Sequence, residues 1–150
     1  MTFHKAIEPK PYKLRKTKKR ICVADYETDS FDGEAVAAFS CGFYDGACYV
    51  DFWGDDCIDQ FFAYLRENYL DNTLLIYMHN GGKFDAYLQY KYLDADQEPL
   101  WLGGRIVSAK FQKQEFRDSL AIMPSPLKKF HTKSGAKQEI DYEKFSRKKK

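Results

Sequence analysis

The sequence predicts an α/β domain built on a mixed β-sheet. Asp45-Gly46 lies between two apolar, β-favouring runs at 36–44 and 47–53, and an Asp-Gly pair in this setting is a strong signal for a β-hairpin. Apolar residues then recur at helical spacing over 57–68, and a short continuous apolar run follows at 73–78. A helix between two runs of this kind indicates that the later strand joins the first sheet in parallel.

Weaker signals place the other elements. They are a strand over 21–26, a helix over 83–93, strands over 100–111 and 115–123, and a short helix near 127–130. The first three strands would form an antiparallel meander whose first strand is central in the sheet. The element order βββαβα begins a ribonuclease H-like α/β fold, and we expect this chain to contain such a fold, truncated at its C-terminal end.

Length and composition support one domain with polar ends. The chain has 150 residues, of which 44% are apolar and 17% aromatic, and this is enough for one sizeable core. Pro9 and Pro11, with little apolar periodicity around them, indicate a basic N-terminal arm over 1–20. The domain is expected over 21–146, followed by a basic tail over 147–150.

The sequence carries no signal for a membrane or for secretion. No apolar run approaches the length of a membrane span, and no secretory signal is present, so we expect no membrane partner and a cytoplasmic location. Cys22, Cys41, Cys48 and Cys57 are widely spaced, lack a CxxC pattern and lie among apolar residues. This pattern favours buried free thiols over disulfides.

Charge is strongly segregated along the chain. Residues 1–20 carry a net charge of +7, residues 21–99 of −13 and residues 100–150 of +8. An acidic segment beside basic ones suits a metal-dependent site that acts on a polyanion, because cations neutralise the acids while Lys and Arg hold phosphates. For residues 1–12 and 147–150 a solvated arm is the simpler interpretation, and contact with nucleic acid stays open.

Three acids are candidate metal ligands. Asp25 and Glu27 lie two residues apart on the first predicted strand, so their side chains project from the same face. Side-by-side carboxylates repel each other, and a bound Mg²⁺ or Mn²⁺ relieves the repulsion. Asp85 follows the loop that contains Gly81-Gly82 and supplies a third carboxylate in the first turn of a helix. Taken alone, Asp85 would be interpreted as a helix-stabilising acid.

These acids belong to an ordered set of short segments. Asp25-Tyr26-Glu27-Thr28 resembles the first exonuclease motif of family B DNA polymerases, and segment 80–85, with Asn80, Phe84 and Asp85, resembles the second. Further segments resemble the protein-primed bacteriophage branch of that family, namely Tyr77-x-His79-Asn80, Asp118-Ser119-Leu120, Pro124-Ser125-Pro126-Leu127-Lys128-Lys129, and Lys137 with Ile140-Asp141-Tyr142. The matches follow the family's order and span most of the chain.

The resemblance implies 3′→5′ exonuclease activity on single-stranded DNA ends, as in proofreading during DNA replication, with two ions of Mg²⁺ or Mn²⁺. Asp25, Glu27 and Asp85 would bind the metals. Lys137 would place positive charge against the scissile phosphate, although without the motif it would be interpreted as an exposed lysine. The residues expected to contact single-stranded DNA are Thr28, Tyr77, His79, Asn80, Phe84, Ser119, Leu120 and Tyr142. A phage-encoded protein would act in the host cytoplasm.

One expected residue is missing. Family B proofreading sites use a fourth carboxylate, in a Tyr-x₃-Asp motif downstream of the lysine, and the sequence reaches Lys150 without it. Tyr92 and Asp96 have that spacing but lie directly after the second motif, which indicates chance. The chain would then be a polymerase fragment, a stand-alone single-stranded-DNA-binding module that does not cut, or a domain whose site a polymerase domain or another chain completes. A purely structural remnant is the remaining alternative.

Overall fold

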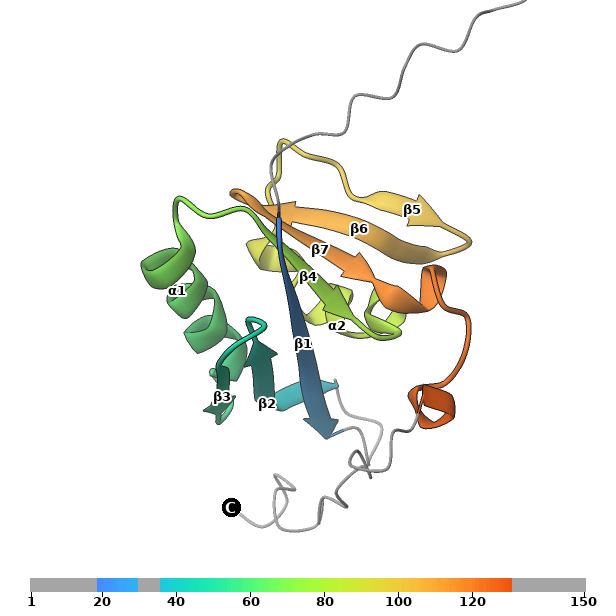
Figure 1. Cartoon of the computed structure of the whole chain (residues 1–150), viewed down its shortest axis with the longest axis horizontal. Helices are drawn as coiled ribbons and strands as arrows, with labels where there is room; N and C mark the ends of the chain where they lie inside the picture. Colours follow the sequence, from blue (N-terminus) through green and yellow to red (C-terminus); the bar gives the residue numbers. More distant parts are fainter. Residues whose placement is uncertain (1–18, 30–35, 131–150) are drawn as a thin grey trace, which may run out of the picture.

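The computed structural model of the chain describes residues 19–29 and 36–130 (Figure 1). The predicted basic tail, Lys137, Tyr142 and almost all of the predicted N-terminal arm lie outside the described residues. No helix in the described part of the chain is long and apolar enough to cross a membrane.

A seven-stranded mixed sheet forms the centre of the fold, with the strand order β3-β2-β1-β4-β7-β6-β5. Its strands are β1 (Arg20–Asp29), β2 (Ala37–Tyr44), β3 (Tyr49–Trp53), β4 (Leu74–Met78), β5 (Leu100–Leu102), β6 (Arg105–Phe111) and β7 (Gln114–Asp118). β1 to β3 form an antiparallel meander, and β4 pairs in parallel with both β1 and β7. β5, β6 and β7 are antiparallel neighbours. The predicted mixed sheet with antiparallel first strands is confirmed.

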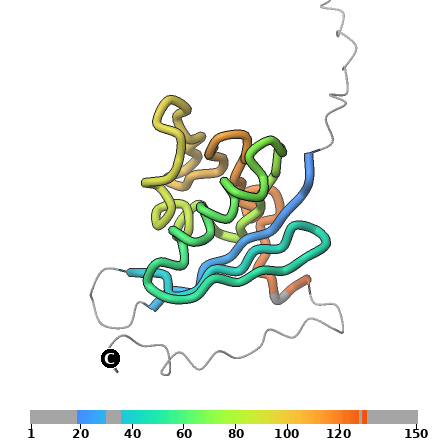
Figure 2. Tube along the Cα trace, turned by 90° about the vertical axis from the view of Figure 1, so that its left-hand side faces the viewer, coloured from blue at the N-terminus to red at the C-terminus, as the bar shows by residue number. Residues whose placement is uncertain are grey.

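The helices are few and mostly short. They are α1 (Cys57–Tyr69), α2 (Asp85–Leu88) and the 3₁₀ helices η1 (Gly81–Lys83), η2 (Tyr90–Tyr92), η3 (Ser119–Ala121) and η4 (Leu127–Phe130). α1 presents its predicted apolar stripe, including Phe61, Phe62 and Leu65, to the core and contacts β2 and β3. In Figure 2 the blue-to-teal meander β1–β3 lies below the yellow segment, in agreement with the strand order.

Two predicted elements near the later motifs are divided. The helix expected over 83–93 becomes η1, α2 and η2, because Phe84 leaves the helical region with φ −125° and ψ −72°. The strand expected over 100–111 turns back on itself at Gly103-Gly104, where both residues have positive φ. A Gly-Gly pair between apolar runs is itself a hairpin signal, so this division follows from the sequence.

The strand expected over 115–123 stops at Asp118. The Asp118 side chain accepts a hydrogen bond from the backbone N–H of Leu120 and so begins η3. An aspartate that caps the next turn offers the backbone a local alternative to continued strand pairing.

Three of the four cysteines behave as expected. Cys22, Cys41 and Cys57 are fully buried and free, whereas Cys48 is exposed in the turn after β2. The prediction of burial is therefore wrong for Cys48, because the Asp45-Gly46 turn directs that residue out of the core. Burial raises the pKa of Cys22 to about 11 and also raises the pKa of Cys41 and Cys57.

Aromatic rings fill the core between α1 and the sheet. Phe62 is fully buried, stacks on Tyr92 at a centroid distance of 4.4 Å and meets Phe111 edge to face at 4.8 Å. Tyr92 also donates a hydrogen bond to Asp59 on α1. These contacts tie η2 to α1, so Tyr92 serves the core, in keeping with the dismissal of its Tyr-x₃-Asp spacing.

Replacement of Phe62 by alanine should lower the free energy of unfolding by about 3–5 kcal/mol, because it removes a ring from a site that cannot collapse. Urea unfolding followed by circular dichroism measures the change. Phe84→Ala is the control, since the Phe84 ring is 60% exposed, and it should change stability by less than about 0.5 kcal/mol. Equal losses in the two variants would contradict this account of the core.

Candidate functional site

The predicted motif segments lie at one edge of the sheet. β1, β4 and β7 are parallel, so their carboxyl ends point to the same edge. Asp25 and Glu27 lie in the second half of β1, His79 directly follows β4, and Ser119 directly follows β7. Strand pairing thus gathers segments that are far apart in the sequence.

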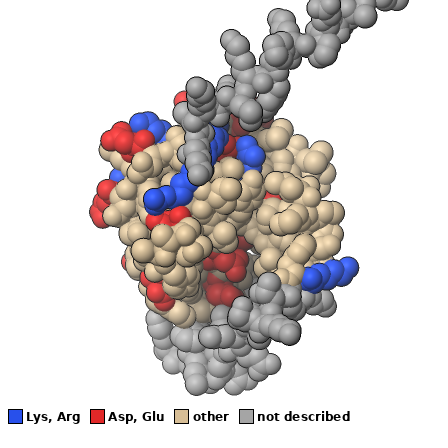
Figure 3. Space-filling model, viewed as in Figure 1, with Lys and Arg blue, Asp and Glu red and all other residues tan. Residues whose placement is uncertain are grey.

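An open pocket lies at this edge and is lined by residues from the first two motifs. Its lining includes Asp25, Glu27, Thr28, His79, Asn80, Phe84 and Asp85. Figure 3 shows acidic side chains inside a hollow on this face of the molecule. The three predicted metal-ligating acids therefore share one pocket with four of the residues expected to contact DNA.

Local backbone irregularity accompanies the acids of β1. The pairing of β1 with β2 shifts register between Glu27, opposite Ser40, and Thr28, opposite Ala38. Such bulges re-aim side chains and are frequent beside active sites. Upstream of the shift, the strand keeps the expected alternation, with Tyr26 buried and Asp25 exposed on the opposite face.

Asp85 has unusual electrostatics for an aspartate. Its side chain is buried, and this burial, together with the charges of Asp25, Asp118 and Glu27, raises the pKa of Asp85 to about 7. A backbone hydrogen bond opposes the rise. Ionised Asp85 is therefore costly near neutral pH, and a cation bound beside it would relieve that cost.

The donor chemistry suits Mg²⁺ or Mn²⁺, because all three acids offer oxygen. However, among the described residues no group of three or more His, Cys, Asp or Glu side chains could hold a metal ion as it stands. The acids share a pocket and influence each other's charge without forming a finished metal cage. The metal ligands stay a prediction.

Gly81 and Gly82 are required by close packing. A Cβ atom on Gly82 would lie 2.3 Å from the carbonyl oxygen of Ile106 and 2.7 Å from Oδ2 of Asp118. On Gly81 it would lie 2.6 Å from Cβ of Met78. Neither glycine has positive φ; the left-handed residue of the loop is Asn80, at φ 62°. Close approach of the backbone, and not positive φ, is therefore what requires glycine at these two positions.

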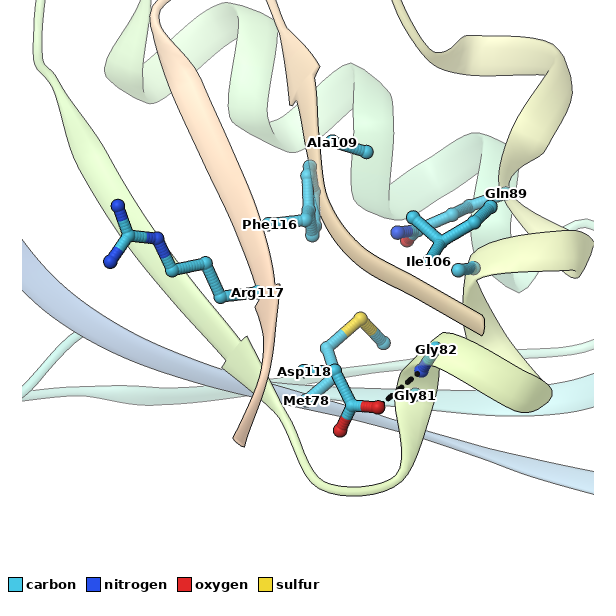
Figure 4. Close-up of a pocket in the computed structure, with 10 residues that line it drawn as sticks. Met78, Gly81, Gly82, Gln89, Ile106, Ala109, Phe116, Arg117 and Asp118 are labelled. Atoms are coloured by element: carbon cyan, nitrogen blue, oxygen red, sulfur yellow. Dashed lines mark hydrogen bonds between the residues drawn. The ribbon is translucent and has the colours of Figure 1, made fainter. Parts of the chain in front are cut away.

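Sequence reasoning missed two residues that hold this loop. Arg105 donates from Nη2 to Oδ1 of Asn80 at 2.9 Å and to Oδ2 of Asp118 at 2.5 Å, and from Nε to the same Asp118 oxygen at 3.0 Å. Asp118 also accepts a hydrogen bond from the Gly82 N–H at 3.3 Å (Figure 4). Asp118 stood inside a recognised motif but had no predicted role, and nothing in the sequence distinguishes Arg105.

Not all of the residues predicted to contact DNA line the pocket. Nδ1 of His79 and Oγ of Ser119 are 3.0 Å apart and hydrogen-bonded, which links the loop after β4 to the start of η3. Tyr77 lies within β4, opposite Val23 and Arg117, and is not among the described residues that line the pocket. Leu120 contributes its backbone N–H to Asp118.

Two comparisons with known proteins relate the chain to bacteriophage DNA polymerases. A third found no protein-family model that matches it. Over 134 residues, or 89% of its length, the chain is 41% identical to a DNA-directed DNA polymerase of Enterobacteria phage PRD1, of which it spans 23%.

The fold matches that of phi29 DNA polymerase. In the complex with primer-template DNA and incoming nucleotide substrates the TM-score is 0.63, with 20% identity over 83% of this chain and 25% of that one. In the complex with single-stranded DNA the TM-score is 0.58, over 83% of this chain and 26% of that one. The ribonuclease H-like fold expected from the element order is confirmed.

The raised pKa of Asp85 gives a test with a defined sign. Above pH 7 the ionised, buried carboxylate destabilises the folded state; as the pH falls below 7 the folded protein takes up a proton, and this cost declines until it vanishes near the pKa of an ordinary aspartate. In metal-free buffer, Asp85→Asn should therefore raise the free energy of unfolding at pH 8 by on the order of 2–4 kcal/mol. The gain should shrink as the pH falls from 7 toward 4.

Urea unfolding in the presence of a chelator, at pH 8 and at pH 5, measures the change in the free energy of unfolding at each pH. Asp71→Asn is the matched control, because the Asp71 side chain is 91% exposed and should respond little at either pH. A loss of stability in Asp85→Asn at pH 8 would contradict the assignment of a strained buried acid.

Proposed function

From the relationship of the chain to the protein-primed family B DNA polymerases of bacteriophages, we propose that its pocket is a metal-dependent 3′→5′ exonuclease site for single-stranded DNA. One observation carries the proposal: Asp25, Glu27 and Asp85, from two separate motifs, line the same pocket. Proofreading in DNA replication is the role that follows, with the 3′ end of a frayed strand as substrate.

Asp25, Glu27 and Asp85 are the residues that would hold Mg²⁺ or Mn²⁺, with two ions expected. Bound metal would activate water and neutralise charge on the scissile phosphate. Around the acids, Thr28 and Asn80 offer polar groups to the sugar and phosphate of the terminal nucleotide. The exposed ring of Phe84 offers a surface on which an unpaired base can stack.

Two further predicted residues, Lys137 and Tyr142, belong to this proposal but lie outside the described residues. Lys137 would stabilise the negative charge that accumulates on the phosphate, and Tyr142 would contact the substrate. The resemblance also implies a fourth carboxylate at the site. Asp118 is a poor substitute, because its oxygens already accept hydrogen bonds from Arg105, Gly82 and Leu120.

A stand-alone module that binds single-stranded DNA without cutting it is the second candidate. It is favoured by the finding that no group of acids among the described residues could hold a metal as it stands. The exposed aromatic ring and polar groups of the pocket would serve such a module equally well.

A nuclease assay separates the two candidates. The whole chain is incubated with 5′-labelled single-stranded DNA and Mg²⁺ or Mn²⁺, and a ladder that shortens from the 3′ end is expected. The double variant Asp25→Ala/Asp85→Ala should abolish the ladder, because it removes two of the three predicted ligands. Asp71→Ala, on an exposed acid outside the pocket, should leave it unchanged.

A gel-retardation assay on the same samples completes the test. Intact DNA that is retarded in the gel would favour the binding module over the nuclease. Intact DNA that is not retarded would overturn both and leave a structural remnant. Single-stranded RNA of the same sequence, run in parallel, tests the preference for DNA.

A further inference from the structure

We propose that Arg105 and Asp118 are positioning residues that clamp the loop carrying the second motif onto the start of η3. The clamp would hold the metal-binding acid Asp85 in register with the DNA-contacting segment Ser119-Leu120. This inference rests on the proposed nuclease function, but it concerns residues that contact neither the predicted metals nor the predicted DNA.

The guanidinium of Arg105 joins three segments of the chain. It extends from the first residue of β6, donates to Asn80 in the loop after β4, and makes two hydrogen bonds to Asp118 at the end of β7. A planar guanidinium directs several donors in fixed directions at once, so the contact fixes orientation as well as distance.

The carboxylate of Asp118 completes the clamp. Oδ2 accepts from Arg105 and from the Gly82 N–H, while Oδ1 accepts from the Leu120 N–H. Its side chain is completely buried, and the side chain of Arg105 is 19% exposed. A buried carboxylate must be neutralised and hydrogen-bonded, and here each requirement is met by a partner from a different segment.

The packing of Gly82 shows how little freedom the loop has. The space that a Cβ would need on Gly82 is occupied by the Ile106 carbonyl and by Oδ2 of Asp118. Figure 4 shows the Asp118 carboxylate directed at the Gly82 N–H. Gly82 is three residues before Asp85, within η1, which leads directly into α2. A shift of the Asp118 carboxylate therefore moves the backbone that carries Asp85.

A second link runs parallel to the clamp. His79 and Ser119 are hydrogen-bonded at 3.0 Å, so the loop is tied to η3 at two points. Two ties between the same segments restrict rotation, which a single tie permits. The expected result is one fixed geometry between Asp85, the proposed metal ligand, and Ser119-Leu120, the segment proposed to contact the DNA.

Three variants test the clamp in the whole chain. Arg105→Met removes the donors but keeps the apolar stem, Arg105→Lys keeps the charge without the fork, and Asp118→Asn keeps the oxygen that can accept from Leu120. Lys113→Met is the matched control, because Lys113 forms an exposed ion pair with Asp71. For each, single-stranded DNA hydrolysis gives kcat and KM, and Mn²⁺ titration followed by electron paramagnetic resonance gives metal affinity.

Arg105→Met and Asp118→Asn should lower kcat about 10- to 100-fold, with KM changed less than about threefold, because the acid is misplaced while the DNA-contacting side chains remain. Mn²⁺ affinity should fall in the same two variants. Arg105→Lys should recover part of the loss, and Lys113→Met should match the wild type. Unchanged kcat and Mn²⁺ affinity in folded Arg105→Met and Asp118→Asn would overturn the proposal.

Amide hydrogen exchange keeps the test independent of activity. Under conditions where all variants are folded, as judged by thermal unfolding, exchange at Gly82 and Leu120 should accelerate in Asp118→Asn while exchange in β2 and α1 stays at the wild-type rate. If the wild type does not hydrolyse DNA, the proposed function fails, and local acceleration still supports the clamp. Uniform acceleration throughout the domain, or none at Gly82, would overturn it.

Discussion

The parallel pairing of β4 between β1 and β7 is the constraint on which the site depends. The last paired residues of the β1–β4 ladder are Val23 and Tyr77, and β4 and β7 end together at Met78 and Asp118. Among the described residues, β1 continues beyond this point in its pairing with β2. Its acids therefore lie just past the end of the parallel ladder, in the space that opens where β4 gives way to a loop.

Close packing and buried charge oppose each other within this space. The loop after β4 must pass directly against the Ile106 carbonyl, which only glycine permits, and this path delivers Asp85 to a buried position near three other acids. The resulting repulsion costs stability that the aromatic core beneath α1 must offset. A cation bound between these acids, as proposed, would relieve that repulsion.

Much of this arrangement could be predicted from the sequence because it is encoded locally. Asp45-Gly46 marks the first hairpin, and the spacing of Phe61, Phe62 and Leu65 marks α1. The Gly103-Gly104 hairpin also had its signal, but the apolar residues on both sides suggested one continuous strand. Arg105 could not be found in this way, because its role arises only when β6, β7 and the loop after β4 come together. The motif acids were found through their order along the chain.

The distribution of thiols decides which of the four cysteines can be modified chemically. Thiolate is the reactive form, so burial and a raised pKa make Cys22, Cys41 and Cys57 unreactive toward maleimides and mild oxidants in the folded protein. Cys48 is exposed in the turn between β2 and β3, away from the residues that line the acidic pocket. A fluorophore can therefore be attached without mutagenesis at one defined point, on a residue that does not line the pocket.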